Sequence, residues 1–391
     1  MILAKDFIQQ CSEMGFNFFT GTPCSYLKPF INTVIDSNGT IENLRYVAAN
    51  NEGEAMALAA GAFLAKENPV VMFQNSGLGN AVNALTSLNY IFKIPCLGIT
   101  TLRGDPLGDA DEPQHELMGS ITTQLLELMK IKWSFFPQTK EEIIPSLTLA
   151  INYIKETSLP YFFVMKNNSV EGYELKNTNQ VYPDNLCTRT QALQIIKKYM
   201  PTQSAFVATT GKTNREFYEI EDAKENLYMV GSMGHALSFG IGLTLSLNRP
   251  NSDSQKTICV IDGDGSLMMR MGSMSMVGTL NPKNLVHILL DNGQHDSTGG
   301  QTTSSEKISF ENVAHFCGYD RSFVVKSAEE FSHVMSKIKP TIQEENCFIR
   351  FFIKPGSPKT LGRPKVTPQE VALRFKNYLN NRYTFNALNF K

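Results

Sequence analysis

ICVIDGDGS, residues 258–266, and VHILLDNGQ, residues 286–294, are the two stretches that decide the fold. Each is an apolar run, rich in β-branched residues, that ends in acidic or amide side chains and a glycine. This pattern is typical of a buried parallel strand and the turn after it. Ligands of open α/β sheets bind at such strand ends. Asp264 offers a carboxylate and Asn292 an amide oxygen, ligand types that Mg²⁺ prefers beside phosphate oxygens.

The spacing of Asp264 and Asn292 strengthens this interpretation. They lie 28 positions apart (292 − 264), which leaves room for one strand–helix–strand unit, so both strand ends can meet at one ion. Gly-Asp-Gly and Asp-Asn-Gly also occur in β-turns, and either one alone favours a turn over a site. Together, each after a buried-strand pattern, they favour a site. Gly265 allows the backbone to come close, and a helix expected after Ser266 can direct free N–H groups at an anion.

Composition narrows the class of protein. The chain has 391 residues, of which 42% are hydrophobic, 10% aromatic and 19% charged, as expected for a globular protein of two ordinary domains. A formal net charge of −1 provides no basic field, so neither nucleic acid nor a membrane is expected as a partner. Seven cysteines without a Cys-x-x-Cys pair indicate reduced thiols. Because no apolar run is long enough to span a bilayer and no signal-peptide pattern opens the chain, we expect a cytoplasmic protein.

Strand patterns alternate with helix patterns along both halves of the chain. Beyond the two stretches quoted above, strands are expected at 15–20, 44–48, 69–73, 94–100, 161–165, 205–208, 227–230 and 347–353. Helices are expected at 6–14, 55–64, 81–88, 140–155, 190–199, 236–247 and 367–379. This alternation predicts an α/β protein with two doubly wound parallel sheets.

Two positions near the start of the chain suit a ligand. Ser25 would cap a helix beginning near Tyr26, or leave the N–H groups of that helix free for an anion. Glu52 and Glu54 lie just before an Ala-rich helix, where carboxylates also suit the helix dipole.

Longer polar loops and one further helix start complete the set of candidates. The loop 103–115 carries His115, either as a substrate contact or as a solvated histidine. Thr190 is expected to cap the helix that follows it. The loop 294–302 is polar and flexible enough to act as a lid.

The motifs resemble those of one enzyme superfamily. Gly263-Asp264-Gly265-Ser266 with Asp291-Asn292 resembles the diphosphate and metal motif of thiamine diphosphate-dependent 2-oxoacid decarboxylases. Asn51-Glu52-Gly53 resembles the start of their pyrimidine-binding helix, and Gly231-Ser232-Met233-Gly234 their segment beneath the cofactor. Within that superfamily the chain is most similar to phosphonopyruvate decarboxylases, in stretches at 21–29, 51–58, 74–85, 111–115, 209–216, 228–234, 292–301 and 363–364.

The resemblance implies the fold and the cofactor site. It implies a pyrimidine domain at 1–166, a linker at 167–188, a diphosphate domain at 189–360 and a tail with a helix at 361–391. Mg²⁺ would be held by Asp264, Asn292 and the backbone carbonyl of Gln294, and Glu52 would be the catalytic carboxyl group beside the aminopyrimidine. Further positions expected at thiamine diphosphate are Pro23, Asn80, Thr213, Asn214, Gly231, Met233, Gly265 and Ser266.

The resemblance also implies the reaction and its partners. The substrate would be the small molecule 3-phosphonopyruvate, decarboxylated to 2-phosphonoacetaldehyde and CO₂ in phosphonate biosynthesis. Its doubly charged phosphonate needs cationic or N–H donors. The candidates are Ser25, Asn75, His115, Lys212 and His295, with Arg103 a further one and Lys212 equally consistent with a surface lysine. In this superfamily Glu52 of one subunit would face the diphosphate domain of another, which implies a homodimer or higher homo-oligomer.

Three alternatives remain open from the sequence. Sulfopyruvate decarboxylases resemble the chain in the same loops but are often split into two polypeptides, so the fused chain and the 292–301 loop favour phosphonate. An acetolactate synthase-like carboligase is disfavoured because the chain has no room for a middle domain. A non-catalytic phosphate- or nucleotide-binding module would retain ligand affinity after Glu52→Gln, whereas an enzyme would lose decarboxylation.

Overall fold

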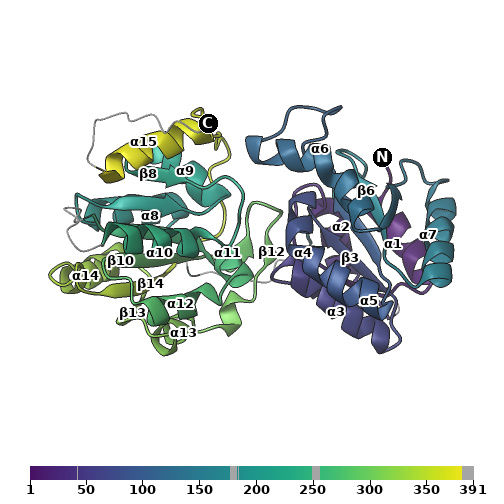
Figure 1. The fold of residues 1–391 in the computed structure, drawn as a ribbon, viewed down its shortest axis with the longest axis horizontal. Helices are drawn as coiled ribbons and strands as arrows, with labels where there is room; N and C mark the ends of the chain where they lie inside the picture. Colours follow the sequence, from purple (N-terminus) through teal and green to yellow (C-terminus); the bar gives the residue numbers. More distant parts are fainter. Residues whose placement is uncertain (42, 177–182, 184, 249–255, 381–391) are drawn as a thin grey trace. The chain divides into compact units, whose positions relative to one another are not determined.

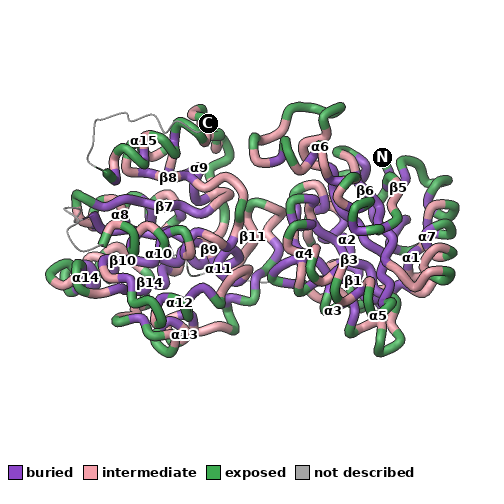
Figure 2. Tube along the Cα trace, in the orientation of Figure 1, coloured by how far each residue is buried: buried purple, intermediate pink, exposed green. Residues whose placement is uncertain are grey.

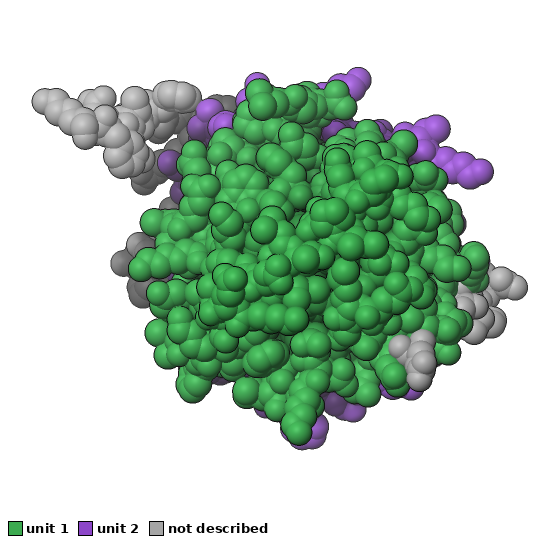
Figure 3. All heavy atoms as spheres, turned by 90° about the vertical axis from the view of Figure 1, so that its right-hand side faces the viewer, with its two compact units in different colours: residues 1–179, 297–301 green, residues 180–296, 302–391 purple. Residues whose placement is uncertain are grey.

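The computed structural model describes residues 1–41, 43–176, 183, 185–248 and 256–380. The chain forms two compact units, Met1–Asn179 with Ser297–Gln301 and Gln180–Asp296 with Thr302–Lys391, which Figure 1 shows as ribbons and Figure 3 as spheres. Residues 177–182 and 184 of the expected linker and 381–391 of the expected tail lie outside the described residues. None of the described helices combines the length and the apolar character that crossing a bilayer requires.

The first unit is built on a sheet of six parallel strands. The strand order is β2-β1-β3-β4-β6-β5. The strands are β1 (Phe18–Gly21), β2 (Arg45–Ala48), β3 (Pro69–Phe73), β4 (Leu97–Thr101), β5 (Lys132–Phe135) and β6 (Tyr161–Met165). Strands β3, β4 and β6 are buried along their whole length, as their continuous apolar runs predict for strands covered on both faces (Figure 2).

Helices cover both faces of this sheet. They are α1 (Ala4–Glu13), α2 (Lys28–Ser37), α3 (Glu52–Leu64), η1 (Asn75–Gly77), α4 (Leu78–Ala84), the π-helical turn η2 (Leu85–Asn89), α5 (Tyr90–Phe92), α6 (Pro113–Leu128) and α7 (Ile143–Thr157). One core contains Phe7, Phe30 and Leu147 from α1, α2 and α7. The other contains Met56 from α3 and Leu126 from α6.

The second unit repeats the same topology. Its strands are β7 (Ala205–Ala208), β8 (Asn226–Tyr228), β9 (Ile258–Gly263), β10 (Leu285–Asp291), β13 (Arg321–Val325) and β14 (Asn346–Phe352). They are all parallel, in the order β13-β14-β10-β9-β7-β8, which read from β8 is the order of the first unit. Two short strands, β11 (Gln294–His295) and β12 (Gln301–Thr302), pair with each other in a separate small sheet. Both sheets are doubly wound and parallel, which confirms the expected fold class.

The helices of the second unit also form two layers. They are α8 (Arg189–Tyr199), α9 (Lys212–Ile220), α10 (Ala236–Leu247), α11 (Asp264–Met269), α12 (Ser273–Leu280), η3 (Ser305–Lys307), α13 (Phe310–Phe316), α14 (Ala328–Ile338) and α15 (Pro368–Asn380). Leu193 of α8 and Phe331 of α14 belong to one core. Leu237 of α10 and Phe375 of α15 belong to the other.

Topology determines where a ligand can bind in each sheet. In each sheet, the strand that comes first in the sequence lies between the strands that come second and third. The change of direction falls between β1 and β3 in the first unit and between β7 and β9 in the second. A crevice opens outside the carboxyl ends of strands at such a point. The residues that follow these four strands are therefore expected to line the ligand site of each unit.

Two local expectations are wrong. Ser25 does not cap a helix, because α2 begins three residues later with Leu27 as its N-cap and no side-chain cap. Thr188, not Thr190, caps α8, through a capping box with Gln191. The loop 294–302 contains the paired strands β11 and β12, and its expected role as a lid stays a prediction.

Candidate active site

Glu52 lies at the first position of α3, directly after β2. Asn51 caps that helix, its side-chain oxygen accepting from the backbone N–H of Glu54 at 3.0 Å. The carboxylate of Glu52 accepts one hydrogen bond from Thr22 Oγ1 at 3.1 Å and one from Asn80 Nδ2 at 2.7 Å. Glu52 is only 6% exposed. The structure therefore brings the predicted residues Glu52 and Asn80 together, beside the half-buried Pro23 in the segment that follows β1.

A glycine makes room for this carboxyl group. Gly77 ends η1, the turn that follows β3, and a Cβ atom built there would lie 2.4 Å from Oε1 of Glu52. No side chain of ordinary size fits at that distance, so residue 77 has to be glycine for Glu52 to keep its position. The turn after β3 and the start of α3 are thus shaped to each other.

Arg103 is the centre of a second group of polar side chains in this unit. Its guanidinium donates to both oxygens of Asp111, from Nε at 3.0 Å and from Nη2 at 2.8 Å. Its Nη1 donates to Ser25 Oγ at 3.2 Å and to Gln74 Oε1 at 3.3 Å. The guanidinium also stands over the ring of Tyr26, 5.0 Å from its centroid. Segments that follow β1, β3 and β4 meet at this one cation.

Burial and charge shift the pKa values of Arg103 and Asp111 in opposite directions. Burial alone would raise the pKa of the Asp111 carboxyl, but the hydrogen bonds from Arg103 and from the backbone of Glu112, with the charge of Arg103, lower it. Burial would lower the pKa of Arg103, but Asp111 raises it. The pKa of His115 is lowered, first by burial and then by the charge of Arg103. Arg103 and Asp111 are therefore a charged pair, and His115 is neutral near pH 7.

His115 does not lie in an open loop, and the expectation of a loop position is wrong. It belongs to the first turn of α6 and is 4% exposed. Its Nδ1 lies 3.1 Å from Oδ2 of Asp111, and its Nε2 lies 3.4 Å from Nε2 of Gln74. The helix packs directly on the chain after Arg103, since a Cβ at Gly119 would meet the carbonyl oxygen of Gly104 at 1.7 Å.

Asn75 lies beneath this group rather than in it. Its side chain is fully buried and donates to the carbonyl oxygen of Arg103 at 3.0 Å and to Thr122 Oγ1 at 2.9 Å. Its Oδ1 accepts from Thr101 Oγ1 at 3.2 Å. Asn75 therefore holds the backbone that carries Arg103, and its polar atoms are occupied by the protein.

In the second unit, Asp264 and Asn292 follow adjacent strands, as the sequence predicts. Gly263 at the end of β9 pairs in register with Leu290 of β10. The next residues along the chain are Asp264 after β9 on one side and Asp291 and Asn292 on the other. Both Asp264 and Asn292 are buried, and Oδ2 of Asp264 accepts a hydrogen bond from Thr303 Oγ1.

The surroundings of Asp264 suit a cation. Burial, followed by the charge of Asp291, raises the pKa of its carboxyl group. Arg350 pairs with Asp291, at 2.7 Å from Nη2 to Oδ2, and no described lysine or arginine forms an ion pair with Asp264. The described residues contain no cluster of three or more His, Cys, Asp or Glu side chains that could hold a metal. A metal here would be bound by one carboxylate together with amide and backbone oxygens, as Mg²⁺ allows.

The other predicted cofactor residues surround the same strand ends. Ser266 Oγ is hydrogen-bonded to Thr209 Oγ1 at 2.8 Å and accepts from the N–H of Gly234 at 3.1 Å. Gly231 N donates to Thr210 Oγ1 at 2.9 Å. These bonds tie the segments after β7, β8 and β9 together. Half-buried Met233 lies in the segment after β8.

The start of α9 and the segment after β10 carry the remaining predicted residues. Thr213 and Asn214 are buried in the first turn of α9, and Asn214 Nδ2 donates to the carbonyl oxygen of Met229 at 2.6 Å. Lys212, at the first position of α9, is half-buried, and burial lowers its pKa. The ring of His295 covers Gly265, where a Cβ would lie 2.6 Å from its Cε1 atom.

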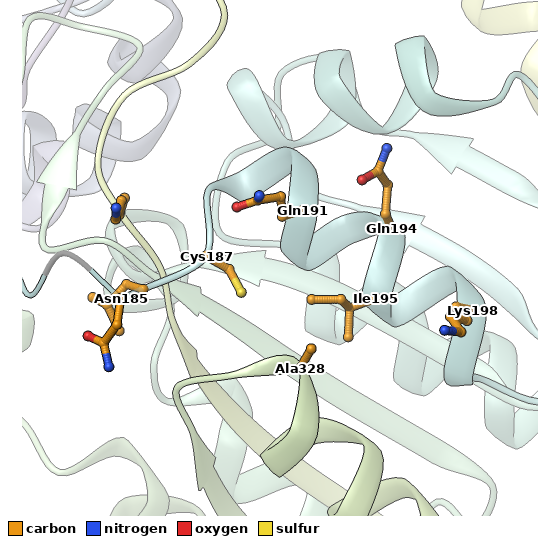
Figure 4. Close-up of a pocket in the computed structure, with 9 residues that line it drawn as sticks. Asn185, Cys187, Gln191, Gln194, Ile195, Lys198 and Ala328 are labelled. Carbon is orange, nitrogen blue, oxygen red and sulfur yellow. The ribbon is translucent and has the colours of Figure 1, made fainter.

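The surface pocket in Figure 4 is a different feature. It has a volume of about 530 Å³ and lies between α8, the start of α14 and the chain around Cys187 (Figure 4). Its lining includes Gln191, Ile195 and Lys198 and none of the predicted site residues. The candidate site is therefore defined by the strand ends and not by this pocket.

Comparison with known proteins shows to which family of proteins this chain is similar. The family model described as thiamine pyrophosphate enzyme, N-terminal TPP binding domain, matches residues 1–122. The corresponding C-terminal TPP binding domain matches residues 203–350. A phosphonopyruvate decarboxylase of Streptomyces viridochromogenes is 41% identical to this chain over 97% of the chain and 95% of its own length. The chain belongs to the phosphonopyruvate decarboxylase family of thiamine pyrophosphate enzymes.

Two further relatives place the chain within this family. A phosphonopyruvate decarboxylase of Streptomyces hygroscopicus is 38% identical over 99% of the chain and 96% of its own length. A sulfopyruvate decarboxylase of Methanosarcina acetivorans is 29% identical over 95% of the chain and 96% of its own length. Thiamine pyrophosphate is thiamine diphosphate under another name, so the two binding domains confirm the cofactor that the sequence motifs predict.

Proposed function

We propose that this chain catalyses the decarboxylation of 3-phosphonopyruvate to 2-phosphonoacetaldehyde and CO₂, with thiamine diphosphate and Mg²⁺. The observation that carries the proposal is the identity of 41% and 38% to two phosphonopyruvate decarboxylases over nearly the whole chain, against 29% to a sulfopyruvate decarboxylase. The product would enter phosphonate biosynthesis. The seven cysteines are all free, which fits a reducing compartment such as the cytoplasm.

Asp264, Asn292 and the backbone carbonyl of Gln294 would hold Mg²⁺ against the diphosphate. The support for this assignment is a buried carboxylate without an ion-pair partner among the described residues, next to an amide oxygen on the adjacent strand end. Gly265 and Ser266 lie in the first turn of α11, a short helix whose first N–H groups have no partner within the helix. Thr213 and Asn214 would lie at the same cofactor.

Glu52 would be the catalytic carboxyl group. Bound thiamine diphosphate supplies a nucleophilic carbon and an electron sink for 2-oxoacid decarboxylation. Glu52 is buried and held at one oxygen by Thr22 and at the other by Asn80. A carboxyl group fixed in this way can hold a proton at a defined atom and return it, which is its proposed role toward the aminopyrimidine. Pro23, Gly231 and Met233 would complete the contacts to the cofactor.

The phosphonate would be bound by cations and by hydrogen-bond donors. Arg103 is the strongest candidate in the first unit, because Ser25 and Gln74 converge on the same guanidinium nitrogen. His115 would contribute an imidazole, and Asn75 would act by holding the backbone of Arg103. In the second unit, Lys212 and His295 are the candidates.

A comparison of substrates tests this function. Turnover of phosphonopyruvate, sulfopyruvate and pyruvate is measured at equal enzyme concentration with thiamine diphosphate and Mg²⁺ present. We expect kcat/KM to be highest for phosphonopyruvate. A higher value for sulfopyruvate would assign the chain to the second candidate function, which the relationship to the Methanosarcina enzyme supports.

The active form is proposed to be at least a homodimer, with the carboxyl group of Glu52 completing the site of a second subunit. Both units present helices with apolar residues on their outer side. On α3, Leu58 is 38% and Leu64 is 71% exposed, and on α10, Phe239 is 42% and Leu245 is 40% exposed. Apolar surface of this kind is typical of contacts between proteins. A strictly monomeric and fully active enzyme in a sizing experiment would exclude this assembly.

A further inference from the structure

The side chain of Asn292 has a fixed orientation in the second unit. Its Nδ2 donates to Oδ2 of Asp296 at 2.6 Å. A carboxylate only accepts hydrogen bonds, so the amide nitrogen has to face Asp296 and the amide oxygen has to face the other way. That oxygen accepts from the backbone N–H of Gln294 at 3.2 Å, and a carbonyl oxygen has a second lone pair for another partner.

Asp296 is itself held by two other segments of the same unit. Arg189, at the first position of α8, donates to Oδ2 of Asp296 from Nη2. The backbone N–H of Gly356, after β14, lies 3.1 Å from Oδ1 and 3.0 Å from Oδ2. Arg189 also donates from Nη1 to the carbonyl oxygen of Gly356 at 3.0 Å and to Oε1 of Glu216 at 2.8 Å. The carboxylate that faces Asn292 is therefore held by two further donors, the guanidinium of Arg189 and the backbone N–H of Gly356.

The ion pair between Arg189 and Asp296 is largely shielded from water, which favours a role other than stability. The Arg189 and Asp296 side chains are 5% and 10% exposed. Taking an ion pair out of water costs about as much free energy as the attraction returns, so a buried pair is weak evidence of a contribution to stability. The pair connects the start of α8 and the chain after β14 to a residue proposed to bind a metal ion.

We infer that Arg189 and Asp296 are positioning residues, which turn the Asn292 amide oxygen toward a divalent cation and so set the affinity of the protein for Mg²⁺ and the diphosphate. The inference rests on the proposed function in that it takes Asn292 as a metal ligand. Groups that orient a metal ligand from behind commonly change metal affinity by about 10- to 100-fold when they are removed.

Asp296→Asn is the direct test. An amide at 296 can donate to Asn292 as well as accept from it, so the orientation of Asn292 is no longer fixed. Arg189 keeps Glu216 as a charged partner, so the buried guanidinium is not left alone. We expect the Mg²⁺ concentration for half-maximal binding of thiamine diphosphate, measured by calorimetry without substrate, to rise about tenfold.

An exchange of the two side chains separates positioning from a general structural effect. Asn292→Asp alone places two carboxylates face to face and should also weaken binding. The double variant Asn292→Asp with Asp296→Asn restores one donor and one acceptor in reversed order. It should therefore recover a large part of the Mg²⁺ affinity that each single variant loses, because the carboxylate at 292 again has a fixed free oxygen.

Two further variants control the experiment. Glu345→Gln makes the same acid-to-amide change in a partly buried ion pair with Arg321. This pair lies at the amino ends of strands β13 and β14, away from the carboxyl ends that carry the site, so the variant should leave Mg²⁺ affinity unchanged. Arg189→Lys keeps the charge, but a lysine has no planar fork with which to bridge Asp296 and Glu216, so it should weaken Mg²⁺ binding. This variant tests the inference independently should Asp296→Asn fail to fold.

Unchanged Mg²⁺ affinity in Asp296→Asn, or a double variant that is as weak as the sum of the single variants, would overturn the inference. The proposed function is tested separately by the substrate comparison above. A wild-type chain that binds Mg²⁺ and thiamine diphosphate with the predicted dependence on Asp296 but does not decarboxylate phosphonopyruvate would refute the function and keep the inference.

Discussion

Arg103 and Asp111 form a two-point pair in which Nε and Nη2 of the guanidinium donate to the two carboxylate oxygens at 3.0 and 2.8 Å. The pair is half-buried, with side-chain exposures of 13% and 8%. Its geometry leaves Nη1 directed at Ser25 and Gln74. Because Asp111 fixes one edge of the guanidinium, Nη1 keeps its position with little loss of side-chain entropy, and a phosphonate would replace Ser25 and Gln74 as its acceptor.

Arg103→Lys should lower kcat/KM for phosphonopyruvate by about 10- to 100-fold, the range expected for the loss of a hydrogen bond to a charged group. A lysine cannot hold Asp111 at two points and reach Ser25 as well. Steady-state rates with phosphonopyruvate and pyruvate measure the effect. Because pyruvate has no phosphonate, its kcat/KM should change much less.

Arg45→Lys is the matched control for Arg103→Lys, since Arg45 is an exposed arginine on β2 of the same unit. It should behave as the wild type with both substrates. Equal losses on phosphonopyruvate and pyruvate in Arg103→Lys would contradict a role in phosphonate recognition and indicate a structural role instead.

The burial of His115 predicts that stability depends on pH. Its folded-state pKa is lowered by burial and by the charge of Arg103, so the unfolded chain takes up a proton below about pH 6.5 that the folded chain resists. The contribution of His115 to stability is therefore complete above that pH and is lost as the pH falls. The thermal midpoint should drop between pH 7 and pH 5, and His115→Gln should make this drop smaller. An identical pH profile in the variant would show that His115 titrates as an ordinary histidine.

Glu52→Gln should reduce decarboxylation by about a hundredfold or more, because an amide cannot hold and return a proton as a carboxyl group does. Binding of thiamine diphosphate, measured by calorimetry, should change far less than turnover. Glu54→Gln is the control, an exposed glutamate two residues along the same helix. Turnover near the wild-type rate in Glu52→Gln would refute the proposed role of this carboxyl group.

Gly77→Ala should destabilise the first unit by about 1–3 kcal/mol and lower turnover, because the new methyl group would overlap the Glu52 carboxyl group. Gly79→Ala on the adjacent α4 is the control, since nothing lies within 4 Å of its Cβ position. It should be neutral or stabilising by up to about 1 kcal/mol in urea unfolding. Equal effects of the two substitutions would mean that helix propensity, and not the fit against Glu52, governs residue 77.

Much of the fold could be predicted because the buried strands have continuous apolar runs. The expected strands 69–73, 161–165 and 205–208 coincide with β3, β6 and β7. Strand β5 was missed because Lys132–Phe135 lies at the edge of its sheet, where polar and apolar residues mix. Strand β13, with residues Arg321–Val325, lies at the edge of the other sheet and was missed for the same reason.

The site could be predicted only where a short motif carries it. The motifs around Asp264 and Asn292 are local in sequence, and the register of β9 and β10 brings them to adjacent strand ends. Two partners of Arg103 are not local, because Gln74 and Ser25 come from other strand ends. The opposite charges of Arg103 and Asp111, eight residues apart in one polar loop, were the available clue to their pairing.

The position of Arg189 opposite Asp296 had no such clue, because 107 residues separate them.

The most direct test of the central claim is the release of CO₂ and 2-phosphonoacetaldehyde from phosphonopyruvate by chelator-treated protein that is free of thiamine diphosphate. Neither product should form until both thiamine diphosphate and Mg²⁺ are restored, after which the two should form in equal amounts. Equal release without the cofactor, or no release when both are present in excess, would contradict the account.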